Sequence, residues 1–171
     1  SSSLSRHLLF AILSIPSEII RSRILYNMTI PFGIGSYYNA TKRFKMNKEQ
    51  ISWLMTTKDY LYQDHGRDLY DVIYATLSED KMSYKLFLKM ASEGHGFSPS
   101  EGFSYALDQD WDIPEEFNEV TFFLGEYESL SISPNHFVQL MQYITDAYIQ
   151  AYPNDKASVE LYMEQLRERY P

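Results

Sequence analysis

Acidic side chains recur at regular intervals between Asp108 and Glu119. Counted from Asp108, carboxylates fall at positions 1, 3, 5, 9 and 12, which is close to the ligand spacing of a calcium-binding EF-hand loop. Position six is Ile113, however, where that loop needs glycine for its sharp turn, and Pro114 stiffens the next position. The charges suit calcium but the backbone does not. A calcium-dependent binding or adaptor protein that uses residues 108–119 is therefore the alternative function, and no metal ligand is assigned.

The favoured interpretation of the same segment is a rigid acidic loop with an exposed aromatic residue, Trp111, at its centre. Aromatic anchors surrounded by charged residues are common at protein-interface hot spots. The predicted partner contacts are this tryptophan and the acids of the loop and of the hairpin after it. They are Asp108, Asp110, Trp111, Asp112, Glu115, Glu116, Glu126 and Glu128.

Signals for catalysis are weak elsewhere in the chain. The four histidines, at positions 7, 65, 95 and 136, are far apart, and none has a metal-ligand spacing such as His-x-x-x-His. Nucleophile-elbow and phosphate-loop motifs are missing, and without cysteine there are no thiolate zinc sites or disulfides. His95 stands between Gly94 and Gly96, where a histidine is usually only a loop residue. We expect a protein that is not an enzyme and has no cofactor; an enzyme with a dispersed carboxylate site would need a buried acid pair in a cleft.

Charge is distributed unevenly along the chain, whose formal net charge is −8. Residues 1–85 carry 11 Lys/Arg against 8 Asp/Glu, whereas residues 86–171 carry 4 against 15. No basic residue stands in the stretch 90–155, and ten of its twelve acids precede Ser133. Such a stretch can steer a basic partner by its field, and the binding region narrows to residues 93–128. An acidic face that only keeps the protein in solution is the alternative.

Two N-terminal features suggest other binding partners. The apolar run from Leu8 to Leu13 is too short to span a bilayer and precedes Pro16, so we expect a buried helix and no membrane partner. A basic patch close to Tyr37, Tyr38 and Phe44 could bind single-stranded nucleic acid, but four charges are few and the acidic remainder repels phosphates. We expect a solvated loop there, or ion pairs with the acidic half, and no direct nucleic-acid binding. The four basic residues are Lys42, Arg43, Lys45 and Lys48.

Apolar periodicity predicts helices at both ends of the chain and strands between them. Ser133 with Pro134 is a typical helix start, and Pro153 ends that helix before a last one capped by Asn154. The fold class is therefore α+β, mostly α-helical with a small antiparallel sheet or hairpin near residues 103–132, in a single domain 1–171. Helices are expected over 4–14, 17–27, 47–66, 69–77 and 81–93 (Met90 inward, Gly94 as its stop), loops over 28–40 and 94–102, and strands over 103–107, 120–124 and 127–132.

Three segments of the second half resemble a known family. They are Phe87-Leu-Lys-Met-Ala-Ser-Glu-Gly-His-Gly-Phe97, then Phe117-Asn-Glu-Val-Thr-Phe-Phe-Leu-Gly-Glu-Tyr-Glu128, and finally Ala151-Tyr-Pro-Asn-Asp-Lys156. In this order, with Ile132-Ser and Phe137 between the last two, they resemble the ribonuclease-toxin immunity proteins of bacterial contact-dependent growth inhibition systems. That family has a helix ending in Gly-x-Gly-Phe, a Phe-x-x-Val-x-Phe-Gly strand followed by acids, and a closing helix pair broken at His-Pro-x-Asp-Lys. Tyr152 replaces the usual histidine here, and Leu124 separates phenylalanine from glycine.

The resemblance covers about residues 70–170 and implies an immunity-protein-like part there; residues 1–70, expected to be helical, have no recognised counterpart. It implies a cytoplasmic protein that binds one copy of a cognate toxin C-terminal domain, a basic ribonuclease for example of the EndoU type. It carries over no catalytic residue, because the family has none. The expected function is neutralisation of that toxin, which protects the producing cell.

Overall fold

A computed structural model describes residues 50–125 and 127–171, with the backbone alone at Leu124 and residues 127–130. The chain divides into two units, Ser1–Phe44 and Lys45–Pro171, and the described residues belong to the second. The helices predicted over 4–14 and 17–27, the loop 28–40, the apolar run and the basic patch all lie outside the described residues.

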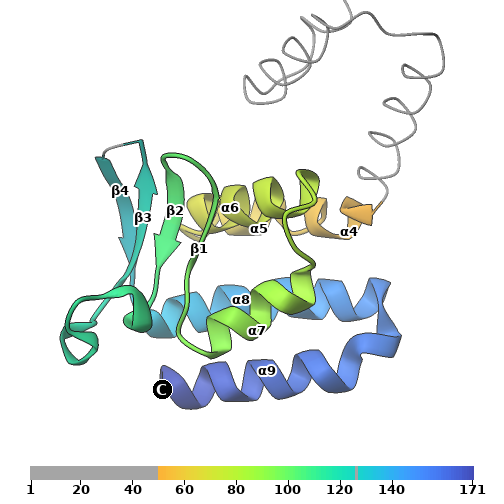
Figure 1. Ribbon diagram of the computed structural model, residues 1–171. Coiled ribbons are helices and arrows are strands. Elements are labelled where there is room, and N and C mark those ends of the chain that lie inside the picture. The colour runs from red at the N-terminus through yellow and green to blue at the C-terminus, as the bar shows by residue number, and fades with distance from the viewer. Residues whose placement is uncertain (1–49, 126) are drawn as a thin grey trace, which may run out of the picture. The chain divides into compact units, whose positions relative to one another are not determined.

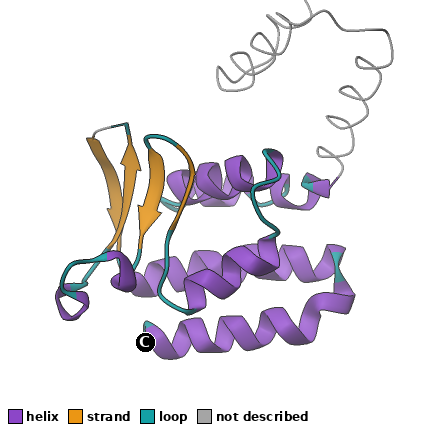
Figure 2. Ribbon diagram, in the orientation of Figure 1, coloured by secondary structure: helices purple, strands orange, loops and turns teal. Residues whose placement is uncertain are grey.

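Helices and a small antiparallel sheet make up the described part, so the predicted α+β class is confirmed. The sheet has four strands in the order β1-β2-β3-β4, and the helices lie to one side of it (Figures 1 and 2). Within this part of the chain, no helix has both the length and the apolar character needed to cross a membrane. In chain order the elements are α4 (Ser52–Met55), α5 (Lys58–Gln63), α6 (Arg67–Ser78), α7 (Tyr84–Ser92), β1 (Phe97–Ser100), β2 (Phe103–Ala106), the 3-10 turns η1 (Asp108–Asp110) and η2 (Pro114–Glu116), β3 (Val120–Leu124), β4 (Tyr127–Ile132), α8 (Pro134–Ala151), η3 (Pro153–Asp155) and α9 (Lys156–Arg169).

Local capping explains where the longer helices begin. The Ser133 hydroxyl accepts the His136 N–H at 3.2 Å, and Pro134 occupies the first position of α8. The Ser83 hydroxyl accepts the Leu86 N–H at 3.2 Å, so α7 begins at Tyr84, later than the predicted residue 81. The start of α8 is confirmed.

Three helical predictions are wrong in detail. The helix expected over 47–66 is broken into α4 and α5, because the Thr56 and Thr57 hydroxyls donate to the Trp53 and Leu54 carbonyls at 2.6 and 2.7 Å. Met90 is only half-buried. Before α9, the capping position belongs to Asp155 and not to Asn154, because η3 adds a tight turn after α8.

Part of the region predicted as loop 94–102 is a strand. β1 has four residues, contains Pro99 and pairs irregularly with β2. It is an edge strand, where proline is tolerated because one row of N–H groups has no ladder partner. The strands β2, β3 and β4 and the turn at Gly125 agree with prediction, with Tyr105 opposite Phe122 in the register.

One hydrophobic core joins the helices to the sheet. Trp53, Leu54 and Leu61 are buried in the same cluster as residues of the second half, so residues 50–70 and 71–171 share one core. Aromatic rings form much of its centre. They are Tyr84, Phe87, Tyr105, Phe122 and Phe137.

Candidate partner-binding site

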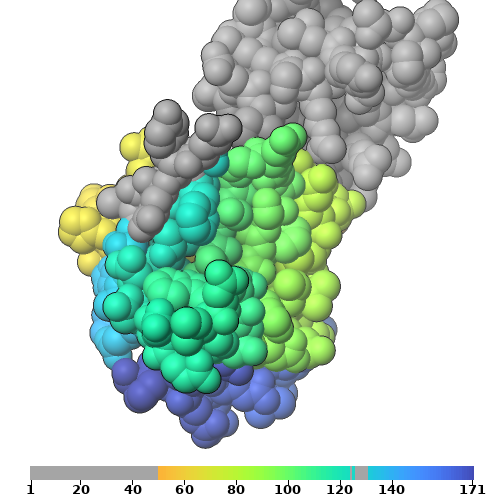
Figure 3. Space-filling view, turned by 60° about the vertical axis from the view of Figure 1, so that its left-hand side comes forward, coloured from red at the N-terminus to blue at the C-terminus, as the bar shows by residue number. Residues whose placement is uncertain are grey.

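The connection from β2 to β3, residues 107–119, is the acidic loop of this protein. It contains η1 and η2 and leaves the sheet at the end where the C-terminus of the chain and the start of α8 also lie (Figure 1). In the space-filling view its side chains protrude directly above α9, which is dark blue (Figure 3). Six of the eight predicted contact residues belong to this loop.

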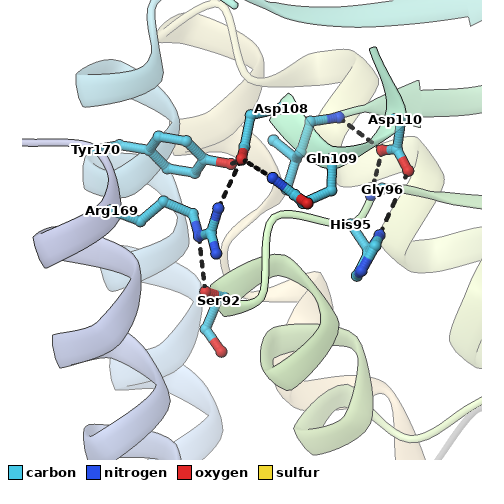
Figure 4. A network of polar contacts seen from close by, with 9 residues as sticks. Ser92, His95, Gly96, Asp108, Gln109, Asp110, Arg169 and Tyr170 are labelled. Atoms are coloured by element: carbon cyan, nitrogen blue, oxygen red, sulfur yellow. Dashed lines mark hydrogen bonds and ion pairs between the residues drawn. The ribbon is translucent and has the colours of Figure 1, made fainter. Parts of the chain in front are cut away.

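Asp108 anchors the loop to the C-terminal helix. Its Oδ2 accepts hydrogen bonds from Arg169 Nη1 at 2.6 Å and from Gln109 Nε2 at 2.8 Å, and its Oδ1 accepts one from the Tyr170 hydroxyl (Figure 4). Arg169 Nε also donates to the Ser92 carbonyl at 3.1 Å, which ties α7 into the same network. Burial, together with the adjacent Asp108 carboxylate, raises the pKa of Tyr170. With 13% of its side chain exposed, Asp108 holds the loop in place and presents little surface to a partner.

Asp110 fixes the same loop to the sheet. Its Oδ2 accepts the backbone N–H groups of Gly96 and Leu107 at 2.6 and 2.8 Å, while its Oδ1 lies 3.7 Å from His95 Nδ1 (Figure 4). A Cβ atom on Gly96 would lie 2.0 Å from the Tyr105 carbonyl oxygen, so only glycine fits beneath the loop. The segment Gly94-His95-Gly96 therefore holds the acidic loop against the sheet.

The outer part of the loop presents its carboxylates to solvent. Asp112, Glu115 and Glu116 are exposed, and none forms an ion pair with another described residue. Trp111 differs from expectation, because it is half-buried and packs edge-on against Phe117 with the ring centroids 5.6 Å apart.

Sequence reasoning missed three residues of this region. Ile113 is 50% exposed beside the free carboxylates, although its type suggested only a fault in a calcium loop. Arg169 and Tyr170 follow Asp108 by 61 and 62 positions. The one available signal was that Arg169 is among the few basic residues that follow the stretch 90–155, which contains acids but no lysine or arginine.

The described part of the β3–β4 hairpin turn lies away from the acidic loop. The β1–β2 and β3–β4 turns lie together, with the Gly125 N–H donating to the Gly102 carbonyl at 2.5 Å, at the other end of β2 and β3 from the loop. Glu126 lies outside the described residues, and Glu128, whose side chain is not described, pairs with Phe123 near that turn. The five residues of β3 separate the two ends by roughly 15 Å.

Basic side chains that precede or follow the stretch 90–155 neutralise some of the acids on or near it. Ion pairs join Lys89 to Glu93 at 3.6 Å, Lys85 to Asp155 at 3.2 Å and Arg169 to Asp108 at 2.6 Å. Hydrogen bonds from Tyr148 and then Lys85 lower the pKa of Asp155. Among the described residues of the stretch 90–155, the exposed acids without a described ion pair are Asp112, Glu115 and Glu116 on the acidic loop, Glu101 at the opposite end of the sheet and Asp146 on α8. The acidic loop is the place where three of them stand close together in the chain.

Comparison of the chain with models of known protein families, with curated proteins and with solved structures finds no match. Charge, burial and hydrogen bonding within the described residues are therefore the grounds for a functional assignment.

The loop geometry does not favour calcium. Asp108 and Asp110 occupy positions one and three of the EF-hand spacing, but their oxygens accept hydrogen bonds from Arg169, Tyr170 and backbone N–H groups. Over residues 50–125 and 127–171, no group of three or more His, Asp or Glu side chains is arranged to hold a metal ion. What the loop offers is a fixed backbone with outward-facing carboxylates, which suits a cationic protein surface.

Proposed function

We propose that this protein is an immunity protein that binds and neutralises a basic ribonuclease toxin domain, for example of the EndoU type. Binding is one to one, in the cytoplasm of the producing cell, and the toxin belongs to a contact-dependent growth inhibition system. The observation that carries the proposal is the set of exposed carboxylates, Asp112, Glu115 and Glu116, on a loop held from both sides. The resemblance of residues 70–170 to that family supports the same function.

Electrostatics links this loop to a ribonuclease partner. A ribonuclease needs cationic groups to hold phosphates, and exposed carboxylates attract such a surface and raise the rate of encounter. Fast association matters for an inhibitor that must reach a toxin before RNA is cleaved. The Asp108 and Asp110 hydrogen bonds order the loop in advance, so less conformational entropy is lost on binding.

The test is the association rate with the toxin domain of a large secreted effector encoded directly upstream. Glu115→Gln removes a charge from the acidic loop, and Glu101→Gln removes the same charge from an exposed glutamate at the other end of the sheet. We expect Glu115→Gln to slow association about two- to threefold at low salt, with the difference disappearing as ionic strength rises. Glu101→Gln should leave the rate nearly unchanged.

Three results would contradict the proposal. An association rate of the unmodified protein that does not respond to ionic strength would refute electrostatic steering. A larger effect of Glu101→Gln than of Glu115→Gln would place the contact at the hairpin end. Absence of any such effector gene, together with failure to co-purify with a basic protein, would refute the proposed immunity function itself.

A further inference from the structure

An open pocket of about 460 Å³ lies beside the acidic loop. Three segments distant in sequence form its wall: the loop itself, the cap and first turn of α8, and the last residue of α9 with the two residues that follow it. Five of the nine lining residues have a ring in their side chain, and these are three prolines, one phenylalanine and one tyrosine. The full lining is Asp108, Pro114, Phe117, Ser133, Pro134, Asn135, Arg169, Tyr170 and Pro171.

The side chains that line this pocket carry no uncompensated charge. Its two ionic side chains, Asp108 and Arg169, are hydrogen-bonded to each other at 2.6 Å. The Tyr170 hydroxyl is also bonded to Asp108, and its ring packs against that of Phe117 with the centroids 5.4 Å apart, so this 6% exposed tyrosine forms a fixed part of the wall. A neutral, flat side chain can enter without separating the ion pair, whereas a second cation would meet Arg169 and the positive end of the α8 dipole.

The outside of the pocket is negative. Glu115 and Glu116 stand between the lining residues Pro114 and Phe117, and both are exposed. A ring-lined hollow with carboxylates at its edge matches an aromatic residue that has lysine or arginine neighbours. In interfaces of this kind a seated aromatic supplies most of the binding energy, while charges at the rim mainly affect the rate of encounter.

We propose that this pocket receives an aromatic side chain of a basic protein partner, whose flanking lysine or arginine residues face Glu115 and Glu116. The inference rests on the proposed function and adds the anchor of the interface to it. The carboxylates set how fast the complex forms, and the pocket sets how long it lasts. Trp111, packed against Phe117, supports the wall and is not itself the anchor.

Two variants on α8 separate filling of the pocket from other effects. Asn135→Trp places a ring in the pocket, and Gln139→Trp places the same ring one turn further along α8, on an exposed position that does not line it. Both variants break the same hydrogen bond, from Gln139 Nε2 to Asn135 Oδ1 at 2.9 Å. Neither position belongs to the core, so both chains should fold.

The first experiment titrates the full chain with short blocked peptides, followed by the backbone NMR signals of Phe117 and Asn135. We expect acetyl-Lys-Tyr-Lys-amide to bind saturably, and the Lys-Ala-Lys and Glu-Tyr-Glu peptides to bind about tenfold more weakly. Asn135→Trp should weaken Lys-Tyr-Lys binding by about the same factor, and Gln139→Trp by less than about twofold. Equal binding of Lys-Ala-Lys, stronger binding of Lys-Arg-Lys, or no binding of Lys-Tyr-Lys would each overturn the proposal.

The second experiment measures dissociation from the toxin domain. Asn135→Trp should raise the dissociation rate about tenfold and leave the association rate nearly unchanged, the opposite of the effect expected for Glu115→Gln. Unchanged dissociation would overturn the pocket proposal while leaving the immunity function intact. If no toxin domain binds, the proposed function fails, and the peptide titration still decides what the pocket accepts.

Discussion

Tyr105 combines deep burial with an unsatisfied polar atom. It is 3% exposed, and its ring packs against those of Phe87 and Phe122 with centroids 5.4 and 6.1 Å away. Its hydroxyl has no hydrogen-bond partner among the described residues. Tyr84, equally buried, shares a hydrogen bond of 2.9 Å with the Thr145 hydroxyl. A buried hydroxyl without a partner costs about 1–3 kcal/mol, so the two tyrosines affect the free energy of unfolding in opposite ways.

Removing each hydroxyl tests this difference. We expect Tyr105→Phe to raise the free energy of unfolding by about 1 kcal/mol, because the ring stays and the unpaired group is lost. Tyr84→Phe should lower it by about 1 kcal/mol, because Thr145 is left without this partner. Urea denaturation at neutral pH measures both. A loss in Tyr105→Phe as large as in Tyr84→Phe would mean that the Tyr105 hydroxyl has a partner of its own, such as a buried water.

Sequence reasoning about single residues succeeded where the cause is local. Ser133 with Pro134 and the glycine after α7 act on neighbours within a few positions, so their effect is readable from the order of residues. The bond from Arg169 to Asp108 spans 61 positions and depends on how α9 packs. The acid type of Asp108 and Asp110 was correct as a signal of an acidic loop, but their internal role needed the fold.

Among the elements, the acidic loop depends most on residues 94–96, the segment that precedes β1. Gly96 donates its N–H to Asp110 and lies so close to β2 that an added Cβ would be 2.0 Å from the Tyr105 carbonyl oxygen. β1 itself was predicted as loop, because a four-residue edge strand with a proline has too little periodicity to be recognised. The longer strands and helices were predictable, since alternation or a 3.6-residue period extends over enough positions.

Alanine substitution at two glycines tests how closely Gly96 approaches the backbone of β2. Gly96→Ala would place a Cβ 2.0 Å from the Tyr105 oxygen, a backbone atom that cannot move aside, so we expect a loss above about 3 kcal/mol in unfolding free energy. Gly125→Ala meets nothing within 4 Å and carries only the cost of its left-handed φ of 69°, about 1–2 kcal/mol. Thermal and urea unfolding provide the comparison. Equal losses would show that the β2 backbone does not approach Gly96 as closely as described.

At the scale of the whole molecule, tyrosine packing makes the fold sensitive to alkali. The chain has 15 tyrosines, and several in the described part lie in or against the core. Burial raises the pKa of Tyr70 to about 12, and burial followed by the hydrogen bond to Asp71 does the same for Tyr62. Because Tyr62 is 37% exposed and Tyr70 only 4%, solvent screening makes the contribution of Tyr62 to stability the smaller one. Burial also raises the pKa of Tyr84 and Tyr105, on α7 and β2. The folded state therefore opposes deprotonation across α5, α6, α7 and the sheet together.

The sign of the pH effect follows from these shifts. In the unfolded chain tyrosine has a pKa near 10, below the value of about 12 for Tyr62 and Tyr70 in the folded state. Their stabilising contribution is thus complete below about pH 10 and is lost as the pH rises through 12. We expect tyrosinate absorbance and the loss of helical circular dichroism to rise together above pH 10, whereas the chain in guanidinium should titrate near pH 10 alone. If most of the tyrosinate signal develops near pH 10 while the helical signal stays constant, the tyrosines are not held by the core as described, because deprotonation would then proceed without unfolding.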